Sequence, residues 1–247
     1  MKKTLYFLTA LLVAFPGWAN MQNNELDYAS TKDIRDINPH LYSGEMAAQN
    51  MVFEPLVLNT EFGPQPHLAE SWSISPDGKT YIFKLRTDVT FSDGEPFNAQ
   101  AVKLNIDAVL DNYTRHGWLE LVQQIDSVRV IDDYTIELKL KNAYYPTLTE
   151  LSFTRPFRFI SPHAFIAGKT KDGVQGYAGT GPWVLAEHEP EQYARFTANP
   201  HYWGKKPQLN AVIWNVIRDR QAMLSALQKG DIQLIFGTDG DMVNMDA

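Results

Sequence analysis

Two β-rich runs on either side of a tight turn restrict the fold more than any other feature of the sequence. Residues 71–75 (SWSIS) and residues 81–86 (YIFKLR) flank a Pro-Asp-Gly turn. Aromatic and β-branched residues around such a turn predict a β-hairpin. Residues 125–131 and 134–140 form a second pair of alternating runs. The centre of the chain is therefore predicted to contain two strand pairs.

A capped helix is predicted between these strand pairs. Asn98 is a favourable N-cap residue, and apolar side chains recur on one helical stripe from Val102 to Leu110. The GPQP run at residues 63–66 predicts a turn. We expect further strands at residues 25–30, 56–59, 183–187, 193–198, 209–217 and 231–236, and further helices at residues 44–52, 144–151 and 219–229. The last of these helices is predicted to be capped by Asp219 and closed by Gly230.

Residues 1–19 have the features of a signal peptide. Lys2 and Lys3 give a basic start, and residues 4–15 form an apolar run that is too short to span a bilayer. Small residues at positions 17 and 19 predict cleavage after Ala19 and export of the remaining chain. A buried N-terminal helix is the alternative interpretation of these residues.

The composition excludes several functional classes. The 247 residues include no cysteine, which excludes disulfides, thiolate metal sites, cysteine nucleophiles and a lipid anchor on cysteine. The formal net charge of −7 at pH 7 is unfavourable for a general nucleic-acid-binding protein. We therefore predict no nucleic-acid partner.

The sequence contains no motif for catalysis or for a protein-built metal site. No two of the six histidines lie two to four residues apart, and the HExxH and EF-hand patterns are absent. The GxSxG, SxxK and GxxxxGK[ST] patterns are also absent. The acid–imidazole triplet Glu187-His188-Glu189 has the composition of a solvated strand end. We predict that the chain is not an enzyme, has no cofactor and supplies no direct metal ligand.

Two segments place arginine beside aromatic rings, namely residues 115–118 (RHGW) and residues 155–160 (RPFRFI). A guanidinium presents a planar set of donors that fits a carboxylate, and aromatic faces add stacking and cation–π attraction. Together with Tyr42 and Met46, these segments are predicted to form half of a cleft for a small anionic ligand.

Alternation along the second of these segments limits how its arginines can be used. If the segment is extended, Arg155 and Arg158 point to opposite sides, so only one of them can face the cleft. Surface arginines that pack their stems on rings are the alternative interpretation. Core packing is the alternative for Trp118, Tyr42 and Met46.

Long motifs resemble one known family. The segments AESWSISPDGKTYIFKLRTDVTFSDGEPFNAQAV, GTGPWVL, NPHYWGKKP and LQKGDIQL are similar to the extracytoplasmic substrate-binding proteins of the peptide/nickel ABC-importer family, solute-binding protein family 5. The resemblance extends from Glu25 to Gly237. The segments NPHLYSGEMAAQNMVFEPL, LDNYTRHGWLELVQQI, AYYPTLTEL and RPFRFISP are most similar to the periplasmic nickel-binding members.

The resemblance implies an α/β fold of the periplasmic binding protein-like type II class, in which two lobes close on a ligand. Residues 1–19 would be the signal peptide, and residues 20–236 the first lobe with an inserted α/β subdomain. Residues 237–247 would be the truncated crossing to a second lobe. Because a pocket gains affinity by burying most of its ligand, a single lobe is expected to bind weakly.

The resemblance also implies the function. The chain would be the substrate-binding component of an ABC importer, periplasmic and monomeric, with a membrane permease as its partner. Its cargo would be nickel(II) held in a small organic chelator. The carboxylates of the chelator would bind Arg155, with Arg115 assisting, Trp118 would stack on the complex, and Tyr42 and Met46 would line the pocket.

Three other functions stay open on the sequence alone. A di- or oligopeptide-binding protein would need an acidic residue for the peptide amine and a roomier cleft. An exported hydrolase would need a nucleophile or a metal triad. Haem binding or chemoreceptor-linked sensing would use the same lobe without transport.

Overall fold

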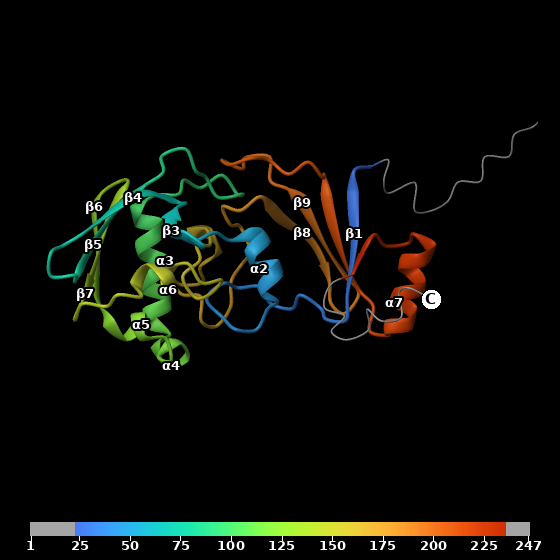
Figure 1. Ribbon diagram of the computed structural model, residues 1–247, viewed down its shortest axis with the longest axis horizontal. Helices are drawn as coiled ribbons and strands as arrows, with labels where there is room; N and C mark the ends of the chain where they lie inside the picture. Colours follow the sequence, from blue (N-terminus) through green and yellow to red (C-terminus); the bar gives the residue numbers. More distant parts are fainter. Residues whose placement is uncertain (1–22, 236–247) are drawn as a thin grey trace, which may run out of the picture.

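Two sheets organise the chain, which the computed structural model describes over residues 23–235 (Figure 1). The larger sheet has the strand order β11-β1-β10-β9-β8, with β1 parallel to both of its neighbours and the other pairs antiparallel. Its strands are β1 (Glu25–Ser30), β8 (Trp183–Glu189), β9 (Tyr193–Ala198), β10 (Ala211–Val216) and β11 (Leu234–Ile235).

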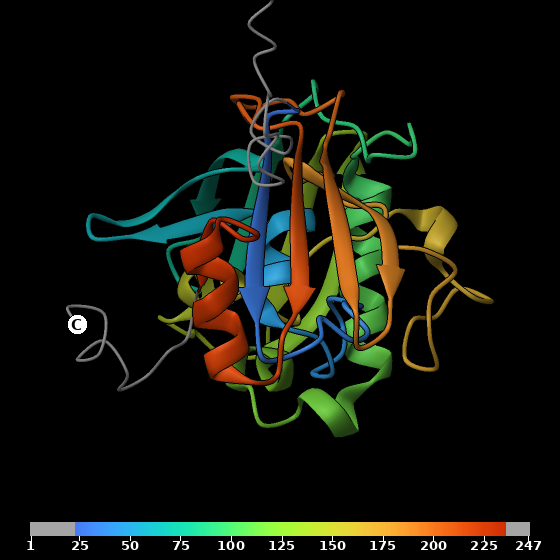
Figure 2. The same cartoon turned by 90° about the vertical axis from the view of Figure 1, so that its right-hand side faces the viewer.

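Helices cover both faces of this five-stranded sheet. Helix α7 (Arg220–Lys229) lies on one face and α2 (Met46–Val52) on the other (Figure 2). Side chains alternate along β1, so Ala29 packs with the α7 side while Tyr28 packs with the α2 side. The predicted ends of α7 are confirmed, since the Asp219 side chain accepts from the backbone at its start and Gly230 ends it in the left-handed conformation.

The second sheet is antiparallel and has the order β4-β5-β7-β6, which confirms both predicted strand pairs. Its strands are β4 (Ala69–Ile74), β5 (Thr80–Leu85), β6 (Ile125–Asp132) and β7 (Thr135–Leu140). Helix α3 (Ala99–Asp111) packs on it, and the Asn98 side chain caps that helix as predicted. Tyr81, Phe83 and Leu85 point from alternate positions of β5 into the shared core.

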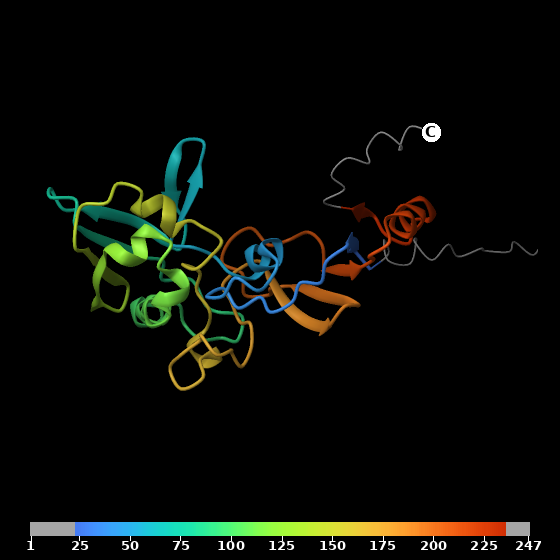
Figure 3. The ribbon, with the colours of Figure 1, turned by 90° about the horizontal axis from the view of Figure 1, so that it is seen from below.

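Helix α2 lies between the two sheets in both Figure 1 and Figure 3. The segment 157–160 also connects the two cores, because Phe157 and Phe159 pack in the core of the four-stranded sheet and Ile160 in that of the five-stranded sheet. Asn105 of α3 fixes this segment through two 2.9 Å hydrogen bonds to the backbone of Ile160.

One local prediction is wrong, and two short helices were not predicted. Residues 63–66 are strand β3 (Gly63–Pro66), which pairs with β2 (Val57–Thr60), and not a turn. Proline is compatible with the edge of such a two-stranded ribbon because its missing N–H can face solvent. The short helices α4 (Tyr113–His116) and α5 (Glu120–Gln124) were not predicted, whereas α6 (Thr147–Leu151) lies within the predicted helix.

The predicted signal peptide at residues 1–19 and the segment 237–247 lie outside the described residues. The domain boundaries at residues 20 and 236 likewise stay predictions. Between residues 23 and 235, no helix combines the length and apolar character that crossing a bilayer requires.

A close backbone approach holds the glycine-rich segment against the end of α2. Gly181 donates to the carbonyl oxygen of Val52 over 2.9 Å, and a β-carbon on Gly179 would overlap that same oxygen. We expect Gly179→Ala to lower the free energy of unfolding by about 2–3 kcal/mol, because the clash involves backbone that cannot rotate away.

Urea unfolding would measure this effect. Gly176→Ala is the matched control, since a β-carbon there meets no atom within 4 Å. Equal stability of the two variants would contradict the close approach of residues 179–181 to α2.

Candidate ligand-binding site

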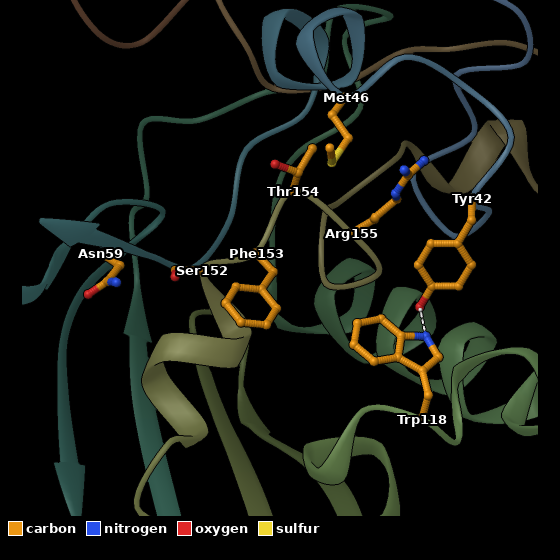
Figure 4. A pocket seen from close by; sticks show the side chains of 8 residues that line it. All are labelled: Tyr42, Met46, Asn59, Trp118, Ser152, Phe153, Thr154 and Arg155. Carbon is orange, nitrogen blue, oxygen red and sulfur yellow. Dashed lines mark hydrogen bonds between the residues drawn. The ribbon is translucent and has the colours of Figure 1, made fainter.

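A cavity of about 560 Å³ opens between α2, strand β2 and the loops that follow α4 and α6 (Figure 4). Its size lies within the range of about 300–1,000 Å³ that is usual for small-molecule sites. The lining residues are Tyr42, Met46, Asn59, Trp118, Ser152, Phe153, Thr154 and Arg155. Four of the five predicted site residues are therefore brought together at one cavity.

The four residues come from three separate parts of the chain. Tyr42 lies in the turn before α2, and Met46 is the first residue of that helix. Trp118 follows α4 in a turn, and Arg155 lies in the bent loop after α6. The cavity wall is thus formed by loops and helix ends that the two cores hold in place.

Tyr42 lies at the centre of the wall. Trp118 donates its indole Nε1–H to the Tyr42 oxygen over 2.9 Å, and the same oxygen lies 2.9 Å from Nδ1 of His116. The Arg155 guanidinium lies over the Tyr42 ring, 5.2 Å from its centroid. Burial raises the pKa of Tyr42 against the lowering effects of Trp118, Arg155 and Arg115, so the phenol is neutral at physiological pH.

Arg155 supplies the positive charge of the cavity. Its Nη1 donates to the carbonyl oxygen of Gly44 over 3.1 Å. Partial burial lowers its pKa from the ordinary value, but a guanidinium still remains charged at neutral pH. Within residues 23–235 it forms no ion pair with a carboxylate, which leaves donors available for an anionic ligand.

Arg115 does not line the cavity. It is exposed on α4, and its charge reaches the site from there by lowering the pKa of both Tyr42 and His116. Its predicted part in holding the ligand therefore stays a prediction. A long-range electrostatic contribution is the role that its position allows.

Arg158 is buried, so the interpretation of both arginines as surface residues is wrong for this one. Its guanidinium donates to the carbonyl oxygens of Phe153, Phe53 and Ser152 at 2.9, 3.1 and 3.3 Å. Burial lowers its pKa to about 10. Only Arg155 faces the cavity, as predicted, although residues 152–159 form a bent loop and not the extended strand on which that prediction depended.

Solvent exposure rules out core packing for two lining residues. The side chain of Trp118 is 64% exposed and that of Met46 is 51% exposed. Large apolar side chains that line a cavity and remain open to solvent are typical of a binding surface. Their exposed faces are available for contact with a ligand.

Four lining residues were not predicted. Ser152, Phe153 and Thr154 immediately precede Arg155, so the arginine itself was the available indication of their position. Asn59 comes from β2, and nothing in its local sequence distinguishes it from an ordinary strand residue.

The described part of the chain contains no group of three or more histidine, aspartate or glutamate side chains placed to hold a metal ion. The polar lining of the cavity consists of hydroxyls, one amide and one guanidinium, with no carboxylate or imidazole. Such a lining is suited to an anionic group and offers poor ligands to a bare cation.

Arg158 is expected to be essential for the cavity loop. Arg158→Met would leave three carbonyl oxygens without their charged donor, at a cost of about 3 kcal/mol in the free energy of unfolding. Chemical denaturation would measure this loss. Arg129→Met is the matched control at an exposed ion pair with Glu137, where we expect a change within about 0.5 kcal/mol. A similar loss in both variants would contradict the assigned role.

Two buried histidines predict acid sensitivity. Burial is the main cause that lowers the pKa of His40 and of His116 from 6.5 to about 4. Between pH 6.5 and pH 4 the unfolded chain therefore binds more protons than the folded chain, and stability decreases as the pH falls through this window.

The urea midpoint as a function of pH would test this dependence. We expect a shallower decrease between pH 6.5 and 4 for His40→Gln than for the unchanged chain. His201→Gln, at an exposed position, controls for the loss of a histidine as such. An unchanged slope in His40→Gln would contradict the prediction.

Known proteins that are similar to this chain include a nickel-binding and a dipeptide-binding protein. The chain is 46% identical over 219 residues to the nickel-binding periplasmic protein of Escherichia coli (strain K12), covering 88% of this chain and 42% of that protein. It is 28% identical over 254 residues to the dipeptide-binding protein of the same bacterium, covering 91% of this chain and 46% of that protein. The chain thus spans less than half the length of these relatives.

A solved structure has the same fold. The crystal structure of NikA from Brucella suis in complex with Fe(III)-EDTA superposes with a TM-score of 0.83 at 48% identity, covering 84% of this chain and 42% of that one. This match confirms the predicted α/β fold of the periplasmic binding protein type. Residues 63–245 match the family described as bacterial extracellular solute-binding proteins, family 5 Middle. The chain therefore belongs to the family 5 extracellular solute-binding proteins.

Proposed function

We propose that this chain forms one wall of the ligand site in a periplasmic binding protein that captures nickel(II) held in a small anionic chelator. The observation that carries this proposal is a guanidinium with no ion pair among the described residues, beside an exposed indole and a half-buried phenol at one cavity. The most similar relatives described above support it, since one is named as nickel-binding and another was solved with a metal–polycarboxylate chelate.

The chemistry of the wall suits a chelate better than a free ion. Arg155 has the planar donors to bind a chelator carboxylate in a two-point arrangement. Trp118 presents an exposed ring to the flat or apolar part of the chelator. Met46 adds a flexible thioether that adapts to the remaining shape. Under this proposal the metal ion arrives already coordinated, and the chain recognises its chelator.

Membership of the family supports further proposals about where the protein acts and which partners it has. We infer that the protein acts in the periplasm after cleavage of residues 1–19, as a monomer that delivers its cargo to the permease of an ABC importer. It has no nucleic-acid partner in this proposal, and it binds its ligand without catalysing a reaction on it.

A peptide ligand is the second candidate because the family includes peptide-binding proteins, such as the relative at 28% identity. A free peptide amine needs an acidic partner. None of the eight residues that line the cavity carries a carboxylate. This observation favours an anionic ligand over a peptide.

Binding experiments with defined chelates would test the proposal. Isothermal titration with nickel(II)–L-histidine, nickel(II)–citrate and a dipeptide should show binding of a nickel chelate and no binding of the dipeptide. Arg155→Met should weaken chelate binding about 30-fold, which corresponds to about 2 kcal/mol for a lost charge-assisted contact. Arg115→Met should weaken it only about threefold, as expected for an exposed charge that acts at a distance.

Arg129→Met is again the matched control, because it removes a guanidinium far from the cavity-lining set. Its affinity should equal that of the unchanged chain. Binding of the dipeptide without binding of either nickel chelate would overturn the proposal in favour of a peptide-binding protein. An equal loss in the Arg155 and Arg129 variants would show that Arg155 does not contact the ligand.

A further inference from the structure

The hydroxyl of Tyr42 has two partners, one in the cavity wall and one behind it. One is the indole Nε1 of Trp118, and the other is Nδ1 of His116, each at 2.9 Å (Figure 4 shows the contact with Trp118). His116 is fully buried and does not line the cavity. Its ring meets the Tyr42 ring edge to face, with the centroids 5.3 Å apart. Tyr42 is therefore the lining residue through which His116 is directly connected to the cavity.

The donors and acceptors at this oxygen can be assigned by counting protons. An indole N–H only donates, so the Tyr42 oxygen accepts from Trp118. A neutral imidazole carries one proton, on either Nδ1 or Nε2. If the proton is on Nε2, the bare Nδ1 accepts the phenol proton. If it is on Nδ1, Tyr42 accepts twice and its own proton is free to point into the cavity.

The hydrogen bonds at Tyr42 favour the proton on Nε2 of His116. Among the described residues Nδ1 is the acceptor within reach of the phenol proton, and it can accept only when it is bare. Burial lowers the pKa of His116, and the backbone carbonyl of His40 opposes that shift, as an acceptor near an imidazole N–H does. Nε2 itself is buried and has no hydrogen-bond partner among the described residues. Nδ1 lies within hydrogen-bond distance of the Tyr42 hydroxyl, so in this tautomer it accepts the phenol proton.

We propose that His116 is a positioning residue that holds the Tyr42 proton away from the ligand, so that Tyr42 offers the cavity an acceptor and never a donor. The inference rests on the proposed function and specifies which chelators it favours. A carboxylate is recognised at Arg155, where donors are available. A group with an N–H or O–H proton, such as a metal-bound amine or water, is recognised at the Tyr42 oxygen.

This arrangement gives the wall two fixed and opposite polar points. Arg155 lies over the Tyr42 ring, so the donor and the acceptor are separated by little more than one aromatic ring. A nickel chelate of an amino acid carries both groups, namely a carboxylate and coordinated amine protons. A chelate with only carboxylates and tertiary amines at its surface has nothing to donate to Tyr42.

The first test needs no ligand. Nitrogen-15 NMR of the full chain would report the His116 tautomer, and we expect Nδ1 to have the shift of an unprotonated nitrogen. His116→Leu should shift the indole proton of Trp118, because Tyr42 would lose the partner that orients its lone pairs. A protonated Nδ1 in the neutral ring would overturn the inference directly.

The second test is a double-mutant cycle on the affinity for nickel(II)–L-histidine. His116→Leu should weaken binding about tenfold in the unchanged chain and have no further effect in the Tyr42→Phe background, since the two residues act through one hydroxyl. His116→Asn keeps an acceptor oxygen near the Nδ1 position and should restore the affinity to within about threefold. Thermal unfolding of each variant shows that it is folded.

Equal losses from His116→Leu in both backgrounds, or no rescue by asparagine, would mean that His116 is only a packing residue. The specificity is tested by comparing nickel(II)–L-histidine with nickel(II)–EDTA, which has no N–H group. Tyr42→Phe should weaken binding of the first about tenfold and leave the second within about twofold. Equal weakening of both would overturn the acceptor assignment.

The two proposals fail in distinguishable ways. A chain that binds neither nickel chelate would contradict the proposed function, and the ligand-free NMR result would then decide the arrangement of His116 and Tyr42 alone. A chain that binds nickel(II)–L-histidine but has a protonated Nδ1 would retain the proposed function and lose this inference.

Discussion

A buried guanidinium determines how the cavity is held together. Arg158 donates to the carbonyl oxygen of Phe53 at the end of α2 and to those of Ser152 and Phe153 in the cavity loop. Removing a cation from water costs free energy unless hydrogen bonds replace its hydration, and here three backbone carbonyls do so. Because one side chain joins both segments, the residues that they carry to the cavity, Met46 and Arg155, cannot move independently.

The compensating charge lies at the next residue along the chain from Phe53. Glu54 is 4% exposed and accepts hydrogen bonds from Nε2 of His67, the hydroxyl of Tyr202 and Nε1 of Trp203, at 2.9, 3.0 and 2.9 Å. Its charge raises the pKa of Arg158 against the effect of burial, without a direct contact between the two. The end of α2 is therefore fixed between a cation that binds the cavity loop and an anion that binds the loop after β9.

The sequence predicted structure well where the determining contacts are local. The caps Asn98 and Asp219 and the closing Gly230 lie within a few residues of the backbone groups they serve, and all three are found as expected. Contacts between residues far apart in the sequence could not be predicted in this way. Arg158 donates to the carbonyl oxygen of Phe53, 105 positions away, and His116 contacts the hydroxyl of Tyr42, 74 positions away. The sequence near Arg158 and near His116 therefore does not indicate that these side chains are buried or which groups they contact.

The same difference applies to the cavity. Some lining residues could be predicted from their side-chain chemistry, whereas others are there only because of how distant segments pack. Arg155 and Trp118 were recognised because guanidinium and indole groups have a functional use whatever the fold. Asn59 and Phe153 reach the cavity only because β2 and the loop after α6 pack beside it. Their amide and ring have many ordinary structural uses, and a sequence pattern alone does not distinguish these uses.

The buried contacts also bear on how the proposed site, although open to solvent, would select a ligand. Trp118 is mostly exposed, yet its indole proton is already committed to Tyr42, and Arg155 is already oriented by the Gly44 carbonyl. The entropy lost in ordering these side chains is lost when the chain folds, so it does not weaken ligand binding a second time. In the proposed site, the Arg155 guanidinium over the face of the Tyr42 ring and the hydroxyl at the edge of that ring would distinguish the two ends of an asymmetric ligand. Under the two proposals, recognition of ligand orientation, more than total contact area, is what these residues would provide.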